Sequence, residues 1–233
     1  MIDFHSHILP RIDDGSSSVE MSIAMLRMQA EQGIDCVVAT PHFYANYDNP
    51  VDFLDRRDRA EEKLRREMAK YSDLPQVFVG AEVYYFRGIS QSDYISQLTI
   101  RGTSCIMVEM VHSPWQPSVY EELEQIHRRW GLTPIIAHVD RYIKPLRSYG
   151  IPANLAKLPV LVQANADFFL RRSTAGMSMR MLRSEQVHLL GSDCHNLSSR
   201  KPNLGDAHHA IKDRLGEAAL TRVQDLGRQV LSL

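Results

Sequence analysis

Short apolar runs alternate along the chain with longer segments in which apolar residues recur at helical spacing. Seven of these runs are rich in Val, Ile or Leu, and their apolar residues are consecutive instead of alternating with polar ones. Continuous apolarity is typical of strands covered on both faces, as in a parallel sheet flanked by helices. The predicted strands span residues 2–5, 34–40, 77–82, 105–109, 134–138, 160–165 and 188–193.

The segments between these runs have the pattern of amphipathic helices. The serines at 16–18 are suited to cap a helix that runs to about Gln32, where Gly33 can end it. Residues 51–71 place one apolar stripe among many charges, which we expect to be solvated. Further helices are predicted at 117–130, around Asn154, at 177–183 and from 207 to the C-terminus. Strand and helix thus alternate about seven times, which predicts an α/β fold: a distorted (β/α)7-type barrel in a single domain over residues 1–233.

The composition mainly argues against several classes of protein. The 233 residues are 44% hydrophobic and 24% charged, with a formal net charge of -1, as in a soluble globular protein. There is no long run of like charge, so we expect no nucleic-acid partner. No apolar stretch approaches the roughly 18 residues of a membrane span, and the N-terminus does not resemble a secretion signal. The three cysteines lack the spacing of a disulfide framework, so we expect a cytoplasmic protein.

Residues that can bind metal ions stand at the ends of the predicted strands, where barrel enzymes assemble their active sites. In chain order these residues are His5, His7, Asp14, His42, Glu82, Glu109, His138, Asp193 and His195. Two residues at i and i+2 in an extended segment point to the same side, so His5 and His7 can reach one ion. Asp193 and His195 repeat this spacing on the last strand, which neighbours the first in a closed barrel.

The chemistry of this set narrows the cofactor. Imidazole and carboxylate ligands without thiolate suit Mn, Zn or Fe. Nine ligands exceed the needs of one ion, and a carboxylate such as Glu82 can bridge two cations about 3.5 to 4 Å apart. Such paired cations clamp the attacking and leaving oxygens in phosphoryl hydrolysis. The sequence therefore predicts a metal-dependent phosphatase at the C-terminal ends of the strands.

Six short motifs carry a family resemblance. They are His5-Ser-His-Ile-Leu-Pro10, Ile12-Asp-Asp-Gly15, Thr40-Pro-His42, Gly80-Ala-Glu82, His138-Val-Asp-Arg-Tyr142 and Ser192-Asp-Cys-His-Asn196. Together they resemble the PHP (polymerase and histidinol phosphatase) superfamily, and within it the bacterial manganese-dependent protein-tyrosine phosphatases of capsule and exopolysaccharide synthesis. The resemblance spans residue 2 to about residue 205. It implies a trinuclear metal site and, as the substrate, the phosphotyrosine of a bacterial tyrosine autokinase.

The same resemblance assigns roles to residues. It implies one ion held by His5, His7, Glu82 and Asp193, a second by Glu82, Glu109 and His138, and a third by Asp14, His42 and His195. The expected metal is Mn²⁺, with Zn²⁺, Fe²⁺ or Mg²⁺ as alternatives. Arg141 and Arg200 match the positions of phosphate-binding arginines, whose planar forks suit a phosphoryl group. We take Arg141, Arg200 and Glu109 as the catalytic residues, acting with a metal-activated hydroxide.

Two positions depart from the family pattern: Arg11 stands where glycine is usual, and Asp140 where glutamate is usual. Cys194 and Arg200 have the Cys-x5-Arg spacing of thiol-dependent tyrosine phosphatases, but the five residues between them contain no glycine to shape a phosphate-binding loop. Alternation along the strand also turns Cys194 away from the two flanking ligands. We therefore predict that Cys194 is not the nucleophile.

Three other functions stay open on the sequence. A small-molecule phosphomonoesterase of the histidinol-phosphate type would need almost the same metal site. A metal-dependent amidohydrolase also opens with His-x-His, but no lysine stands at a middle strand end to supply its bridging ligand. A non-catalytic regulator that binds the kinase is disfavoured by the complete set of ligands.

Overall fold

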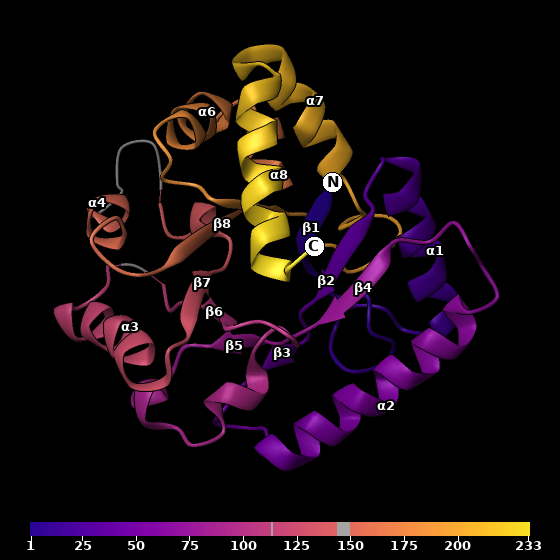
Figure 1. Ribbon diagram of the computed structural model, residues 1–233, viewed down its shortest axis with the longest axis horizontal. Coiled ribbons are helices and arrows are strands. Elements are labelled where there is room, and N and C mark those ends of the chain that lie inside the picture. The colour runs from indigo at the N-terminus through magenta and orange to yellow at the C-terminus, as the bar shows by residue number, and fades with distance from the viewer. Residues whose placement is uncertain (113, 144–149) are drawn as a thin grey trace.

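The computed structural model describes residues 1–112, 114–143 and 150–233. Its strands are β1 (Ile2–Ser6), β2 (Cys36–Ala39), β3 (His42–Phe43), β4 (Gln76–Val79), β5 (Glu82–Tyr84), β6 (Cys105–Glu109), β7 (Thr133–Ile136), β8 (Leu161–Asn165) and β9 (Leu189–Gly191). Each strand pair in the described ranges is parallel, in the orders β1-β2-β4 and β3-β5-β6-β7-β8-β9. The strands curl round a common axis, with the helices outside (Figure 1).

Two positions in the ring are each occupied by two short strands. The strand predicted at 34–40 is observed as β2, and the unpredicted β3 follows it after Pro41, which has no N–H to donate to a neighbouring strand. The run at 77–82 is interrupted between β4 and β5, where Gly80 lies so close to Ile100 that a Cβ would be 3.1 Å from its side chain. Backbone hydrogen bonds from Gly80 to Ala39 and from Glu82 to Pro41, both 2.9 Å, hold the two pairs of short strands side by side.

The ring closes between the last and first strands. The Asp193 N–H donates to the His5 carbonyl at 2.7 Å, and the His7 N–H donates to the Cys194 carbonyl at 2.9 Å. In this ring, β2 and β3 together count as one strand, and so do β4 and β5. The predicted distorted (β/α)7-type barrel is therefore confirmed.

Helices surround the barrel: α1 (Val19–Glu31), α2 (Pro50–Met68), α3 (Pro117–Trp130), α4 (Ile151–Leu155), α5 (Ala166–Leu170), α6 (Ala175–Arg183), α7 (Leu204–Leu215) and α8 (Glu217–Leu231), with 3-10 turns η1 (Ile89–Gln91), η2 (Ile95–Leu98) and η3 (Val139–Arg141). Ser18 caps α1 by accepting from the Met21 N–H at 3.2 Å, and Gly33 follows the helix with φ of 77°. Helix α5 was not predicted. Within the described ranges, none of these helices combines the length and apolarity that crossing a membrane requires.

The charges of α2 were predicted to face solvent, and for two of them this is wrong. Arg57 and Glu61 are buried. The Arg57 Nη1 donates to the carbonyls of Gly80 and Gln97, both at 3.3 Å. Arg57 therefore stabilises the break between β4 and β5, where β5 begins with the predicted ligand Glu82.

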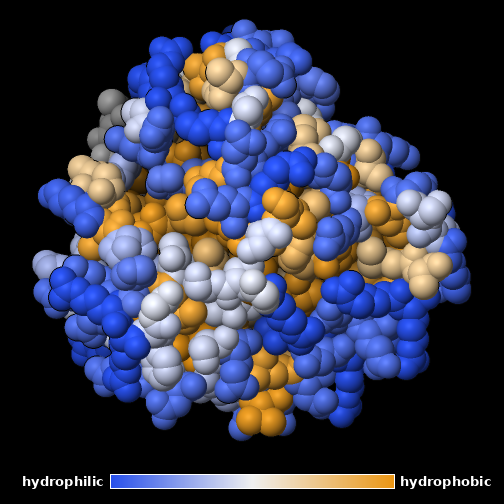
Figure 2. All heavy atoms as spheres, in the orientation of Figure 1, coloured by the Kyte–Doolittle hydropathy of each residue, from blue (hydrophilic) through white to orange (hydrophobic). Residues whose placement is uncertain are grey.

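The interior of the barrel is apolar at the end opposite the predicted ligands. A cluster that includes Ile2, Phe4, Val38, Met107 and Leu189 fills it. Helix α8 crosses this end in the foreground of Figure 1, and its Gly227 packs so closely that a Cβ would lie 2.8 Å from the Phe4 ring. Figure 2 shows the outer face here as hydrophilic surface interrupted by apolar patches. The C-terminal ends of the strands are thereby left to carry the polar site.

Candidate metal centre

Glu82 lies at the centre of the predicted site and is 1% exposed. Its Oε2 is 3.2 Å from His5 Nε2, 3.3 Å from His7 Nε2 and 2.9 Å from His42 Nδ1. Its Oε1 is 2.8 Å from His138 Nε2. One carboxylate thus faces four imidazoles that come from three different strands or strand ends. This is the arrangement that a ligand shared between cations requires.

The remaining three carboxylates surround this group. Asp193 Oδ1 lies 3.6 Å from His5 Nε2 and 3.5 Å from His7 Nε2. Asp14 Oδ1 lies 3.5 Å from His42 Nε2 and 3.3 Å from His195 Nε2. Glu109 Oε1 lies 3.6 Å from His138 Nε2. The structure therefore brings all nine predicted ligands together.

Three groups of ligand atoms, each with all members within 4.8 Å of one another, have the geometry to hold an ion: His7, Asp14, His42 and His195; His5, His7 and Asp193; and His42, Glu82 and Glu109. These groups resemble the predicted sets but are not identical to them. His7 joins the predicted third set, and His42 stands with Glu82 and Glu109, where His138 was expected. Which residue binds which ion stays a prediction.

Unpaired polar atoms show that the donor set suits cations. Among the described residues, three buried site atoms have no hydrogen-bond partner: His42 Nδ1, Glu82 Oε2 and His195 Nε2. Leaving a buried polar atom unpaired costs about 1 to 3 kcal/mol, and each of these three faces other ligand atoms. Divalent cations would satisfy all three, so the residues fit the predicted metals.

Metal binding requires deprotonated ligands, and the residues of the centre meet this requirement to different degrees. Burial alone would raise the pKa of Glu82, but the charge of His5 and the adjacent imidazoles of His138 and His42 hold it well below its usual value. The pKa of Asp193 is likewise held low by His5 and His7 against burial. Burial and the charge of His7 lower the pKa of His195 to about 4. The pKa of Glu109 is instead raised, by burial and by the charge of Glu82.

Asp13 supports the centre without being one of the predicted ligands. Its Oδ2 accepts from His7 Nδ1 at 2.7 Å and from the His42 N–H at 3.1 Å, and its Oδ1 accepts from the Gly15 N–H at 2.9 Å. Because an ionised carboxylate only accepts, His7 Nδ1 carries a proton, and a neutral His7 ring would present its Nε2 lone pair to a cation in the centre. The sequence placed Asp13 in the right loop but did not reveal this role.

Strand β8 supplies no predicted ligand, yet two of its residues position ligands on other strands. Gln163 Oε1 accepts from His5 Nδ1 at 3.3 Å and from the His138 N–H at 2.6 Å. Gln163 Nε2 donates to Asn165 Oδ1 at 3.0 Å, and Asn165 Nδ2 donates to Asp193 Oδ2 at 3.0 Å. Sequence reasoning missed both, although two amides in an otherwise apolar, buried strand were a usable signal.

Two of the ligands have strained backbone. His138 has φ of 30° and Asp193 has φ of 53°, in the left-handed region that costs non-glycine residues energy. Hydrogen bonds hold both in place, from the His138 N–H to Gln163 Oε1 and from the Asp193 N–H to the His5 carbonyl. Neighbouring strands therefore fix the direction in which these side chains leave the barrel.

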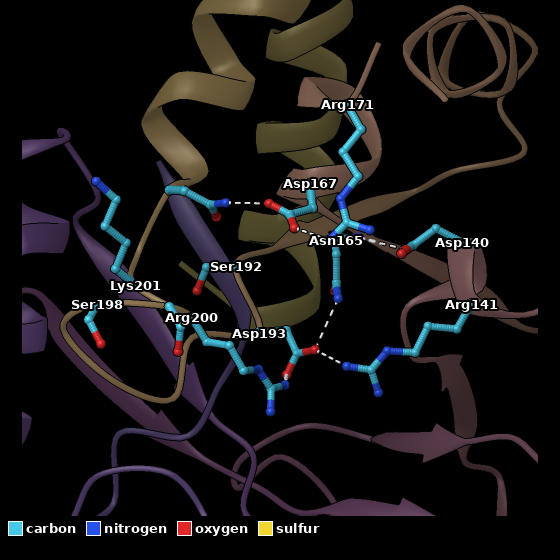
Figure 3. Close-up of a pocket in the computed structure, with 12 residues that line it drawn as sticks. Asp140, Arg141, Asn165, Asp167, Arg171, Ser192, Asp193, Ser198, Arg200 and Lys201 are labelled. Carbon is cyan, nitrogen blue, oxygen red and sulfur yellow. Dashed lines mark hydrogen bonds and ion pairs between the residues drawn. The ribbon is translucent and has the colours of Figure 1, made fainter. Parts of the chain in front are cut away.

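The two predicted phosphate-binding arginines lie at one edge of the centre. Arg141 Nη2 is 2.5 Å from Asp193 Oδ2, and its Nη1 is 3.4 Å from Glu109 Oε1. Arg200 Nη2 is 2.9 Å from Asp193 Oδ1, and its Nη1 is 3.7 Å from Asp14 Oδ2. Figure 3 shows the two arginines approaching Asp193 from opposite sides, below a cavity of about 490 Å³. Both side chains are more than a third exposed and can reach a bound anion.

Cys194 is turned away from the centre, as predicted. It is fully buried, and its Sγ accepts from Gln29 Nε2 at 3.4 Å. Burial and the nearby charge of Asp3 raise the pKa of its thiol far above the usual value. A thiol without thiolate character and without access to solvent is a poor nucleophile.

The structure also shows the surroundings of Arg11 and Asp140, the two residues that depart from the family pattern. Arg11 has φ of 59°, a conformation in which glycine is free of strain, and its Nε donates to the Ser17 carbonyl at 2.9 Å. Arg11 is thus bound to its own loop and adds no donor to the metal centre. Asp140 lines the cavity beside Arg141, where its Oδ1 accepts from the Asn165 N–H at 3.0 Å.

Comparison with known proteins identifies the group to which this barrel belongs. Residues 1–226 match the family described as capsular polysaccharide synthesis, CpsB/CapC. The chain belongs to the CpsB/CapC family. It is 24% identical to the tyrosine-protein phosphatase CpsB of Streptococcus agalactiae serotype III (strain NEM316), over 97% of this chain and 98% of the relative. It is 29% identical to the tyrosine-protein phosphatase YwqE of Bacillus subtilis (strain 168), over 93% of this chain and 85% of the relative.

Solved structures share the fold of this CpsB/CapC protein. One described as YwqE from Bacillus subtilis and CpsB from Streptococcus pneumoniae, unique metal-dependent tyrosine phosphatases, superposes with a TM-score of 0.81 at 22% identity, covering 99% of this chain and 94% of the other. The lactonase Lmo2620 from Listeria monocytogenes has a TM-score of 0.55 at 13% identity, covering 98% of this chain and 91% of the other. At these identities the likeness concerns the fold, and it agrees with the barrel predicted from the sequence.

Proposed function

We propose that this CpsB/CapC protein is a metal-dependent protein-tyrosine phosphatase. The observation that carries the proposal is the carboxylate of Glu82 facing four imidazoles, with Arg141 and Arg200 at the edge of the same centre. Its relatives CpsB and YwqE, which match nearly the whole chain, are tyrosine-protein phosphatases. Metal ligands and anion-binding arginines in one site are the parts that phosphoryl hydrolysis needs.

Bound divalent cations would lower the pKa of water toward about 7 and neutralise the charge of the phosphoryl oxygens. His5, His7, Glu82 and Asp193 would hold the cations, in agreement with their orientation toward one another. Asp13 and Gln163 would keep the imidazoles turned to the centre with their lone pairs available.

The chain's own residues would then position the substrate. Arg141 and Arg200 pair with Asp193, a residue that would hold a cation, and both guanidiniums would then be available to bind the phosphoryl oxygens. The tyrosyl oxygen leaves as a phenolate of pKa about 10, so little help from a general acid is needed. Glu109, whose Oε1 lies 3.4 Å from Arg141 Nη1, would hold a cation and orient the Arg141 guanidinium toward the phosphate.

We further propose Mn²⁺ as the ion, with Zn²⁺, Fe²⁺ or Mg²⁺ as alternatives, because the donors are imidazoles and carboxylates without thiolate. The family description, capsular polysaccharide synthesis, supports a substrate in that process, and we propose the phosphotyrosine of a cytoplasmic tyrosine autokinase. The absence of a membrane-spanning helix from the described ranges is compatible with this location.

The proposal is tested by removing metals with a chelator and restoring them singly. We expect the chelated protein to be inactive on a phosphotyrosine peptide and Mn²⁺ to restore the most turnover. Histidinol phosphate and an amide serve as parallel substrates. Faster hydrolysis of histidinol phosphate would indicate a small-molecule phosphatase, and turnover of the amide an amidohydrolase. No turnover of any substrate with each metal supplied would contradict the proposal and favour a regulator without activity.

A further inference from the structure

The cavity of about 490 Å³ beside the metal centre extends beyond Arg141 and Arg200, the two residues proposed to bind the phosphate. These two arginines form its edge toward the ligands, so the cavity continues outward from the place proposed for the phosphoryl group (Figure 3). Its volume is within the range of ligand pockets. A substrate bound at the metals would therefore have its flanking groups next to this space.

Polar chemistry distinguishes this cavity from a second one on the other side of the centre. All twelve residues that line the first cavity are polar or charged. The second, of about 380 Å³, is lined in part by Tyr44 and Tyr47 beside His42 and Asp14. The aromatic walls suit the phenyl ring of a phosphotyrosine, since ring pairs stack favourably. The first cavity, with no aromatic wall among its described residues, suits a charged group.

Arg171 lines the first cavity together with the cationic side chains of Arg141, Arg200 and Lys201. In Figure 3 its side chain extends down from the end of α5 into the cavity, on the side opposite Asp193. Its Nη2 is 2.5 Å from Asp167 Oδ2, and Asp167 Oδ1 accepts from Asn203 Nδ2 at 2.7 Å. In the part of the chain that the structure describes, Asp167 is the one acceptor of this guanidinium, which leaves most of its N–H groups free.

Four cationic side chains and three carboxylates line the cavity, so one positive charge is left uncompensated. Asp193 is paired with Arg141 and Arg200, and it is a predicted metal ligand. Asp140 accepts from the Asn165 N–H, and Asp167 is shared between Arg171 and Asn203. An anion entering the cavity would thus meet the free donors of Arg171 together with the arginines of the phosphate site.

We propose that this cavity is a second anion subsite, in which Arg171 binds an acidic group that flanks the phosphotyrosine of the substrate. The group is a carboxylate side chain or a second phosphate ester. The inference rests on the proposed phosphatase activity and adds sequence preference to it. Because the Arg171 side chain is 69% exposed, the expected effect is modest, about two- to fivefold in kcat/KM at low salt.

The experiment measures kcat/KM of the manganese-loaded protein on a set of phosphotyrosine peptides. One peptide is flanked by alanines, others carry a single glutamate at each position from -3 to +3, and one series carries a non-hydrolysable phosphotyrosine analogue at the same positions. Free phosphotyrosine gives the activity that does not depend on flanking groups. The variants are Arg171→Gln and Arg171→Glu, with Arg172→Gln as the matched control, because Arg172 is an exposed neighbour that does not line the cavity.

We expect one or two glutamate positions to be preferred over alanine, and the preference to be lost in Arg171→Gln and in high salt. Arg171→Glu is expected to disfavour the same glutamate peptides, while free phosphotyrosine is hydrolysed as before and Arg172→Gln behaves as the parent. A larger effect with the analogue than with glutamate would identify a second phosphate as the ligand. Equal kcat/KM for all peptides, or equal losses in Arg171→Gln and Arg172→Gln, would overturn the subsite while leaving the phosphatase intact. Failure to hydrolyse even free phosphotyrosine and the alanine peptide would contradict the proposed function itself.

Discussion

Replacing Asp13 by Asn would test how far the metal centre depends on residues that are not its ligands. Asn has the shape of Asp, but only one of its two side-chain atoms can accept a hydrogen bond. Asp13 accepts from His7 Nδ1 at 2.7 Å, from the His42 N–H and from the Gly15 N–H. An amide nitrogen facing His7 favours the tautomer with the proton on Nε2, which removes the lone pair from the predicted ligand atom.

Asp13→Asn is expected to change both the affinity for Mn²⁺ and the folding free energy. Residues that orient metal ligands typically contribute about 10- to 100-fold in metal affinity, so Asp13→Asn is expected to weaken Mn²⁺ binding by that factor. In the metal-free protein, burial acts to raise the pKa of Asp13, but the hydrogen bond and charge of His7 lower it from the usual 3.8 to about 2. That difference corresponds to about 2 kcal/mol of folding free energy at neutral pH.

The sign of the pH dependence is set by the lowered pKa. A carboxylate whose pKa is lower in the folded state stabilises the fold above its unfolded pKa of about 3.8, and this contribution is lost as the pH falls toward 2. We therefore expect chelated wild-type protein and chelated Asp13→Asn to differ in unfolding free energy at pH 7 and to converge between about pH 4 and pH 2. Denaturant unfolding measures this difference, and competition with a chelator measures the affinity for Mn²⁺. Equal affinities in the two proteins would refute the role assigned to Asp13, even if their stabilities differed.

Two further substitutions address the nucleophile and the strand break. Cys194→Ser is expected to retain metal-dependent turnover. Iodoacetamide is expected not to inactivate the folded wild type, because the thiol is buried and its pKa is raised. Loss of activity in both tests would support a mechanism in which Cys194 is the nucleophile. Arg57→Met is expected to lower the free energy of unfolding by about 1 to 3 kcal/mol, because the carbonyls of Gly80 and Gln97 lose their donor. Calorimetry would show this loss as a fall in Tm of several degrees. Arg59→Met, at a 70% exposed position on the same helix, is the control, and an equal fall in both variants would contradict the contact.

The sequence predicted the elements with strong periodicity well. Helix α3 has the predicted bounds 117–130, and β6 has the predicted bounds 105–109. The short strand β3 after Pro41 was not predicted. The break at Gly80 was missed because the apolar run continues through it, and only the packing against Ile100 and the contact from Arg57 reveal the break. The burial of Arg57 was missed for the same reason: a charge on an amphipathic helix is ordinarily solvated, and its acceptors lie on distant segments.

The ligands were predictable because each stands at the end of an apolar run, and strand ends in a barrel meet at one rim. Their support was harder to find. Asp13 and Gln163 act through hydrogen bonds to His7 and His5, and no spacing rule connects residue 163 with residue 5. Arg171 was not considered, because its place in the cavity depends on Asp167, one helical turn earlier, which turns the guanidinium inward.

The closure of the barrel between β1 and β9 bears on how the protein matures. His5 and His7 are made first during synthesis and Asp193 and His195 near its end, and the two pairs meet only after the last strand has paired with the first. A nascent chain released early would keep several imidazoles and Glu82 but lack Asp193 and His195, so it would bind cations weakly. Metal uptake would then favour the finished polypeptide over its fragments, and a tightly bound ion would itself report that synthesis and folding are complete.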